Sequence, residues 1–186
     1  MPTSFLHNNG GYRKLRAYQV SEIVYDITYH FAHRFLEKGD RTIDQMIQAA
    51  SSGKQNIAEG SAAATTSREM EIKLYNVARA SLQELLVDYE DYLRVRGLSH
   101  WNINDEKSRQ TRRVCGRHND SEFYREAIKL RSDETIANIA ITLIHQADVL
   151  MRGLIERAQI DFLKEGGIRE QMTRTRLEYR KRNQGG

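Results

Sequence analysis

Apolar residues recur at intervals of three and four along most of this chain, which places their side chains on one face of an α-helix. The recurrence is strongest in four stretches, at residues 12–38, 42–60, 66–96 and 133–165. In the first stretch the shared face consists of Val20, Ile23, Ile27, Phe31 and Phe35. The pattern therefore predicts four long amphipathic helices.

Glycines and capping residues mark the expected ends of these helices. Gly39, Gly60 and Gly97 each follow an apolar stripe, and glycine favours the backbone conformation that terminates a helix. Thr42 and Thr66 each precede Gln or Glu by three residues, which is the spacing of a capping box. We expect the second helix to run from Thr42 to Gly60 and the third to begin after Thr66.

Two segments lie outside the four stripes. Residues 98–131 are predicted to be an insertion with short helices near 105–117 and 121–130, because connections within a bundle are usually only a few residues long. Residues 166–186 contain good helix formers but few apolar residues, which indicates a charged helix. We expect a bundle over residues 1–165 that includes the insertion, followed by a basic C-terminal extension.

Four amphipathic helices of this length need one another to bury their apolar faces. An up-down-up-down four-helix bundle achieves this with short connections, so the sequence predicts an all-α fold. The second and third helices also carry apolar residues on more than one face: Met46, Ile47, Ile72, Leu74, Val77, Leu86 and Leu93. This surplus indicates either a wide core or, as we favour, an interface between copies of the chain.

One sequence block carries a family resemblance. Residues 45–60 read QMIQAASSGKQNIAEG, and Ser81-Leu82-Gln83-Glu84-Leu85 follows in the next helix. The block resembles that of bacterial four-helix-bundle proteins encoded in intervening sequences of 23S ribosomal RNA genes, and of the related accessory variability proteins of diversity-generating retroelements. The matching residues are Gln45, Ala49, Ala50, Ser52, Asn56, Ile57, Ala58, Glu59, Gly60, Thr66, Glu69, Ala78, Ser81, Leu82, Glu84 and Leu85.

The resemblance extends from about Tyr18 to Val95 and departs from the family at two places. Gly53-Lys54 stand where the family has Ile-Pro, and Ser61 stands where it has an aromatic residue. The resemblance implies the same bundle fold and a homo-oligomer, because related proteins look like rings of five bundles. It implies no catalytic activity.

Charge gives the second clue to function. The chain has 29 Lys and Arg against 25 Asp and Glu, a formal net charge of +4 and an isoelectric point near 9.2. The cations form three groups, near the first helix, in the insertion and in the extension. They are Arg13, Lys14 and Arg16; Lys107, Arg109, Arg112, Arg113 and Arg117; and Arg169, Arg174, Arg176, Arg180, Lys181 and Arg182.

Clustered arginines favour a phosphate-bearing ligand, because guanidinium groups bind phosphate through paired hydrogen bonds. Aromatic residues near these groups could stack on bases: Tyr12, Tyr18, Tyr124, Tyr179 and Trp101. We expect a homo-oligomeric accessory protein that binds nucleic acid, with structured RNA or an RNA–protein complex favoured. A protein-interaction adaptor built on the same oligomeric bundle is the alternative.

The residues indicate no enzyme and no cofactor. The chain has no glycine-rich phosphate loop, no G-x-S-x-G motif and no Glu-x-x-His pair of a di-iron bundle. His30 and His33, with Asp26 and Glu37 each four residues from one of them, have a spacing that a metal site could use, so a metal-binding bundle is a third, less favoured alternative. Cys115 has no cysteine partner. Residues 1–14 contain no apolar run typical of a signal peptide, and no stretch approaches the ~20 apolar residues of a membrane span, so we expect a cytoplasmic protein.

Overall fold

The computed structural model describes residues 11–183 and is all-α over that range. It begins with a short 3-10 helix, η1 (Tyr12–Lys14). The α-helices are α1 (Arg16–Phe35), α2 (Arg41–Ala63), α3 (Arg68–Val95), α4 (Glu106–Arg117), α5 (Ser121–Ile128), α6 (Asp133–Glu165) and α7 (Ile168–Asn183).

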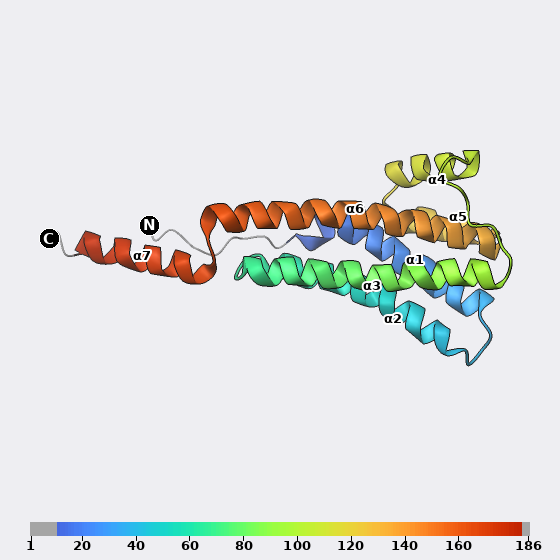
Figure 1. Ribbon diagram of the computed structural model, residues 1–186, viewed down its shortest axis with the longest axis horizontal. Helices are drawn as coiled ribbons and strands as arrows, with labels where there is room; N and C mark the ends of the chain where they lie inside the picture. The colour runs from blue at the N-terminus through green and yellow to red at the C-terminus, as the bar shows by residue number, and fades with distance from the viewer. Residues whose placement is uncertain (1–10, 184–186) are drawn as a thin grey trace.

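Four of these helices form the predicted antiparallel bundle (Figure 1). In it, α1 packs against α2 and α6, and α3 packs against the same two helices. Each bundle helix therefore buries its apolar stripe against two neighbours. The all-α, up-down-up-down fold predicted from the sequence is confirmed.

The core contains the residues that the helical periodicity selected. Val20, Ile27 and Phe31 of α1 are fully buried. Tyr89 on α3 is also fully buried, and its hydroxyl donates a hydrogen bond to the Thr28 hydroxyl at 3.0 Å. This bond satisfies a polar group that would be costly to bury alone. Of the apolar surplus on α2 and α3, Met46, Leu86 and Leu93 belong to the core.

Two glycines allow α2 and α3 to pack closely. A Cβ atom added at Gly53 would lie 2.6 Å from Leu82 Cδ2, and one added at Gly60 would lie 2.7 Å from Tyr75 Cε1. The expectation that Gly60 ends α2 was wrong, since the helix continues to Ala63. Gly60 makes room for a ring of the neighbouring helix instead.

The same seam contains a polar contact between the two helices. The hydroxyl groups of Ser52 and Ser81 lie 2.9 Å apart, and the Asn56 amide donates to the Ser52 carbonyl oxygen at 2.9 Å. These residues belong to the family-like block, as do Gly60 and Leu82. The block therefore marks the place where α2 and α3 pack on each other.

The N-caps of α2 and α3 differ from prediction by two residues and by one residue, and α1 begins at Arg16 rather than at Tyr12. Asp40 caps α2, since its carboxylate accepts a hydrogen bond from the Thr42 amide at 2.8 Å. Ser67 caps α3, since its hydroxyl accepts one from the Met70 amide at 3.2 Å. Both are good N-cap residues, and they provide the side-chain oxygen that was assigned to threonines nearby. Gly97, with φ of +64°, follows α3 as expected.

The predicted insertion and extension are helical. α4 packs on α6, and α5 packs on α1. α6 ends before Gly166, whose φ is +75°, and α7 then projects past the end of the bundle (Figure 1). Residues 184–186 of the predicted extension lie outside the described residues. Among those residues, no helix is long and apolar enough to span a bilayer.

We predict that Gly60→Ala destabilises the bundle. Alanine is normally favoured over glycine inside a helix by about 1 kcal/mol. Here its methyl group would meet the buried ring of Tyr75, and overpacking of this kind costs about 1–3 kcal/mol. Chemical denaturation should therefore show a lower free energy of unfolding. The matched control is Gly153→Ala on α6, where no atom lies within 4 Å of the added Cβ. It should stabilise the protein, and a stabilised Gly60→Ala would contradict the prediction.

Candidate nucleic-acid interface

The loop that leads into α4 is fixed to α6 by one buried side chain. The Asn138 carbonyl oxygen accepts a hydrogen bond from the Trp101 amide at 2.8 Å. Its NH₂ group donates to the carbonyl oxygens of Ser99 and Glu134, each at 2.8 Å. Asn138 thus uses both ends of its amide to hold the connection between α3 and α4. No pattern in the sequence distinguishes this residue from other polar residues of α6.

α4 turns a narrow face inward and its cations outward. Ser108 and Cys115 are buried, and burial raises the pKa of the Cys115 thiol. The five predicted cations of this helix are all exposed: Lys107, Arg109, Arg112, Arg113 and Arg117. The composition of α4 therefore produces a helix with a small apolar face and a basic outer surface.

The cations of α4 differ in their bonding. Arg112 donates to the Ser108 hydroxyl and to the Ile103 carbonyl oxygen, both at 2.7 Å, and so braces the start of the helix. Arg109 lies 3.1 Å from the exposed Glu106 carboxylate, a pair that water screens strongly. Arg113 and Arg117 make no ion pair with the described residues. Both of these guanidinium groups are exposed to solvent.

The first basic group adjoins the end of α4. Arg16 donates to the Gly116 carbonyl oxygen at 2.5 Å, which places a cation at the negative end of the α4 dipole. Arg13 and Lys14 are exposed on η1, and the Arg13 guanidinium lies 5.0 Å from the centre of the Tyr12 ring. The structure therefore brings the first group and the insertion together, with Arg16 as the link.

The third basic group lies on α7. All six of its cations are exposed, and none forms an ion pair with a described residue: Arg169, Arg174, Arg176, Arg180, Lys181 and Arg182. Glu170 and Glu178 are the acidic residues of this helix. Because positive charges outnumber negative ones six to two on α7, this helix is a strongly basic surface.

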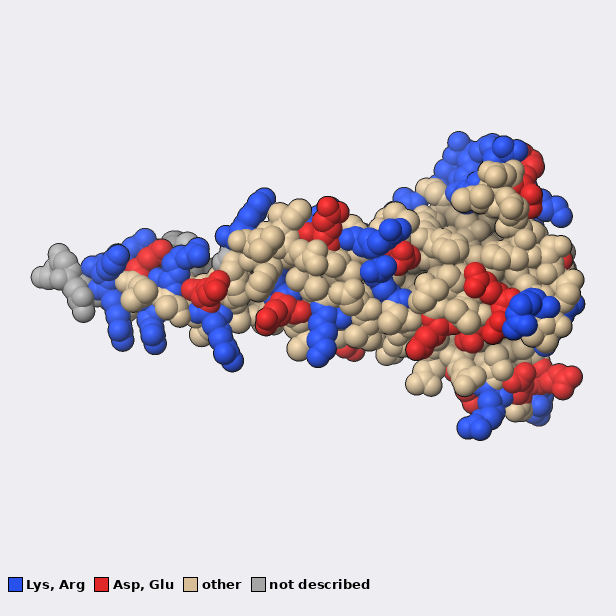
Figure 2. All heavy atoms as spheres, in the orientation of Figure 1, with Lys and Arg blue, Asp and Glu red and all other residues tan. Residues whose placement is uncertain are grey.

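On the face that Figure 2 shows, the basic groups do not form one continuous patch. Figure 2 shows Lys and Arg gathered over α7 at one end of the elongated molecule and over α4 toward the other, with acidic side chains around the α4 end and below it. α6 runs between them (Figure 1). A single copy of the chain therefore presents two separated cationic surfaces.

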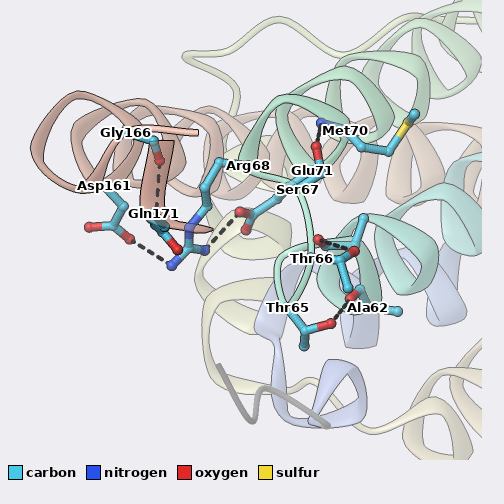
Figure 3. A network of polar contacts seen from close by, with 11 residues as sticks. Ala62, Thr65, Thr66, Ser67, Arg68, Met70, Glu71, Asp161, Gly166 and Gln171 are labelled. Carbon is cyan, nitrogen blue, oxygen red and sulfur yellow. Dashed lines mark hydrogen bonds and ion pairs between the residues drawn. The ribbon is translucent and has the colours of Figure 1, made fainter. Parts of the chain in front are cut away.

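An ion-pair network lies at the end of the bundle from which α7 projects (Figure 3). The Arg68 guanidinium lies 2.9 Å from the Glu71 carboxylate and 3.7 Å from that of Asp161. It thus links the first turn of α3 to the last turns of α6, and both Arg68 and Glu71 are largely shielded from water. Burial and the Glu71 carboxylate together raise the pKa of the nearby Tyr75 phenol. The base of α7 adjoins this network, where Gln171 donates to the Gly166 carbonyl oxygen at 3.4 Å.

The aromatic residues predicted to stack on bases fall into two classes. Tyr18 and Tyr124 are 8% and 3% exposed, so for them the prediction was wrong. They pack into the core, since their neighbours in the helical stripe are apolar. Tyr12 and Trp101 are partly buried, and Tyr179 on α7 is exposed.

The histidines of α1 make contacts unrelated to metal binding. His33 Nδ1 lies 2.8 Å from the Tyr29 carbonyl oxygen, and burial together with the Arg34 cation lowers the pKa of His30. Among the described residues, no group of three or more His, Cys, Asp or Glu side chains could hold a metal ion. Glu59, part of the family-like block, is exposed and makes no hydrogen bond or ion pair with the described residues.

Comparison with known proteins identifies no relative. No family model matches the chain, and no curated protein or solved structure matches it either. What stands is a helical bundle with a few long packed helices and two basic appendages.

We predict that Asn138→Ala releases α4 while the bundle stays folded. The substitution leaves the Trp101 amide and the Ser99 carbonyl oxygen without this partner, at a cost of about 1–3 kcal/mol. Cys115, the one cysteine of the chain, is 2% exposed on the inner face of α4 and reports this opening. Its labelling by a thiol reagent should accelerate about 5- to 150-fold if opening limits the reaction.

The matched control for this prediction is Asn76→Ala. Asn76 is exposed on α3, where its amide makes one hydrogen bond, to the Ile72 carbonyl oxygen. This variant should leave the labelling rate unchanged. Equal labelling rates of Cys115 in wild type and in Asn138→Ala would show that the loop between α3 and α4 holds α4 in place without the Asn138 amide.

Proposed function

We propose that this chain is a non-enzymatic, homo-oligomeric accessory protein that binds nucleic acid in the cytoplasm, with structured RNA or an RNA–protein complex as its ligand. The observation that carries the proposal is α7, whose six cations are exposed and lack ion-pair partners among the described residues. A cation that has no partner in the protein is available to a phosphate. Each contact with a phosphate releases a condensed counterion, which favours binding at low salt.

The two separated basic surfaces fit an extended ligand. α7 and α4 lie toward opposite ends of the molecule, so one copy has two places at which a folded RNA could be contacted (Figure 2). Oligomerisation would repeat both surfaces around a symmetry axis and strengthen the field at each. Exposed cations on a rigid helix suit the recognition of backbone rather than of sequence.

Family membership forms part of the proposal. The residues shared with the intervening-sequence proteins include Ser52, Asn56, Gly60, Ser81 and Leu82, and all of them lie at the seam between α2 and α3. Agreement at positions that contact one another supports a shared bundle. By the same resemblance, we propose a ring-like homo-oligomer with five subunits.

A protein-interaction adaptor is the second candidate. α7 exposes Met172, Leu177 and Tyr179 among its cations, at 52%, 50% and 68% of their full surface. Large apolar side chains on a projecting helix favour a protein partner. Binding of that kind would depend weakly on salt, which separates it from the phosphate-mediated alternative.

We predict that the wild-type protein binds a labelled RNA hairpin and that replacing Arg174, Arg176 and Arg180 with Gln weakens this binding. Fluorescence anisotropy from ~50 to ~200 mM salt should give a linear fall of log affinity with log salt. Each lost phosphate contact should reduce the magnitude of that slope by about one, so the triple variant should lose about three.

A control with the same change of charge separates local contacts from the net charge of the protein. Lys38, Arg41 and Lys73 are exposed, make no ion pair with the described residues, and lie outside the three basic groups. Replacing them with Gln should leave the slope within about one of the wild-type value. If both triple variants behave like wild type, α7 does not bind the RNA.

We also predict that the protein is an oligomer in dilute solution. Light scattering coupled to size-exclusion chromatography should give a multiple of the 21.6 kDa chain mass, and a ring of five would give about five times that value. The mass should be unchanged in the α7 variant, because the proposed contacts of α7 are with RNA. A mass of one chain at all concentrations would contradict the oligomer.

A further inference from the structure

A groove of about 730 Å³ lies between α1 and α5, apart from the three predicted basic groups. Residues of α1 form one side, and residues of α5 and its C-terminal end form the other. The lining consists of Tyr25, Asp26, Tyr29, His30, His33, Arg34, Arg125, Ile128 and Lys129. Of the aromatic lining residues, Tyr25 also packs against the core of the bundle.

Three aromatic rings follow one another along α1 within this groove. The ring centres of Tyr25 and Tyr29 are 6.4 Å apart, and those of Tyr29 and His33 are 4.3 Å apart. Tyr29 is 51% exposed, so its ring is accessible from solvent. At a rise of about 1.5 Å per residue, the row from residue 25 to residue 33 is about 12 Å long, which matches three or four bases stacked about 3.4 Å apart.

Cations flank this row on both sides. The Lys54 ammonium of α2 lies 4.3 Å from the centre of the Tyr25 ring. On the other side, Arg125 is exposed and makes no ion pair with the described residues. Arg34 is exposed and remains a cation while it donates a hydrogen bond to the Lys129 carbonyl oxygen at 2.7 Å.

Negative charge is sparse at the groove. Asp26 is the acidic residue among the lining side chains, and its carboxylate accepts a hydrogen bond from the Ser121 hydroxyl. Lys129 pairs with Glu126 at 2.6 Å, but both side chains are more than half exposed, so water screens the pair. The lining is therefore aromatic along its length and cationic at its edges.

We infer that this groove binds a single-stranded segment of nucleic acid, whose bases stack on the row of Tyr25, Tyr29 and His33. The cations Arg34, Arg125 and Lys54 would then face the phosphates on either side. Aromatic side chains in a basic groove are the features by which proteins hold single strands without reading their sequence. An organic cation is disfavoured by the surrounding positive charge, and a duplex keeps its bases inside.

The inference rests on the proposed nucleic-acid binding and adds to it a site that contacts bases, separate from α7. The test uses the full chain and two labelled oligonucleotides of equal length, an oligouridylate and its abasic counterpart. Both carry the same phosphates, and only one carries bases. Wild-type protein should bind the oligouridylate more tightly, and a 2-aminopurine placed in that strand should lose fluorescence on stacking.

Two substitutions at one position isolate the ring. Tyr29→Ala should weaken binding of the oligouridylate about 5- to 150-fold, which is the range that loss of one stacked base gives. Tyr29→Phe keeps the ring and should bind like wild type. Affinity for the abasic strand should be the same in all three proteins. The triple Gln variant of α7 should still quench 2-aminopurine.

Three results would overturn the inference. Equal wild-type affinity for both strands would leave phosphate binding intact and remove the stacking site. Unchanged affinity in Tyr29→Ala, with weakened binding of a poly-glutamate peptide, would assign the groove to an acidic protein segment. No binding of either strand or of the RNA hairpin at ~50 mM salt would refute the proposed function as well.

Discussion

The close approach of α2 to α3 is the constraint on which the remaining packing depends. At Gly53 and Gly60 a side chain is absent, and the space is filled by Leu82 and Tyr75 of the facing helix. The Ser52 and Ser81 hydroxyls meet across the same seam. Because α3 in turn packs on α6, the separation of these two helices sets where α6 lies. A methyl group at the seam would therefore act on the whole bundle.

Basic residues that look alike in the sequence have different roles in the structure. Arg16 donates a hydrogen bond to a carbonyl group at the C-terminal end of α4, and Arg112 donates one to a carbonyl group in the loop before this helix. Arg113, Arg117 and the cations of α7 have no such partners among the described residues. Part of the basic character of the insertion thus holds the insertion in place. The remainder is available to a ligand.

Periodicity predicted the fold because burial of an apolar stripe determines which face of each helix turns inward. It placed α6 to the residue, from Asp133 to Glu165. The prediction that Gly60 ends α2 failed, because this glycine makes room for the ring of Tyr75 on another helix. In the sequence, such a glycine cannot be distinguished from one that ends a helix. Tyr18 and Tyr124 were misassigned for a related reason, since proximity to arginine in the chain does not determine exposure. The row of Tyr25, Tyr29 and His33 could have been found from its spacing of four residues. The sequence does not show that α5 forms the other side of the groove.

The length of α6 fixes more than the size of the core. This helix begins just after the insertion and ends at the glycines before α7, so its length sets the distance between the two basic appendages. Its 33 residues correspond to about 50 Å. Adding one residue to α6 would lengthen this helix by about 1.5 Å and would also rotate α7 by about 100° around the axis of α6. Only insertions or deletions close to whole helical turns would change the distance between α4 and α7 while keeping the direction in which α7 points. The distances available to this fold therefore differ by discrete steps.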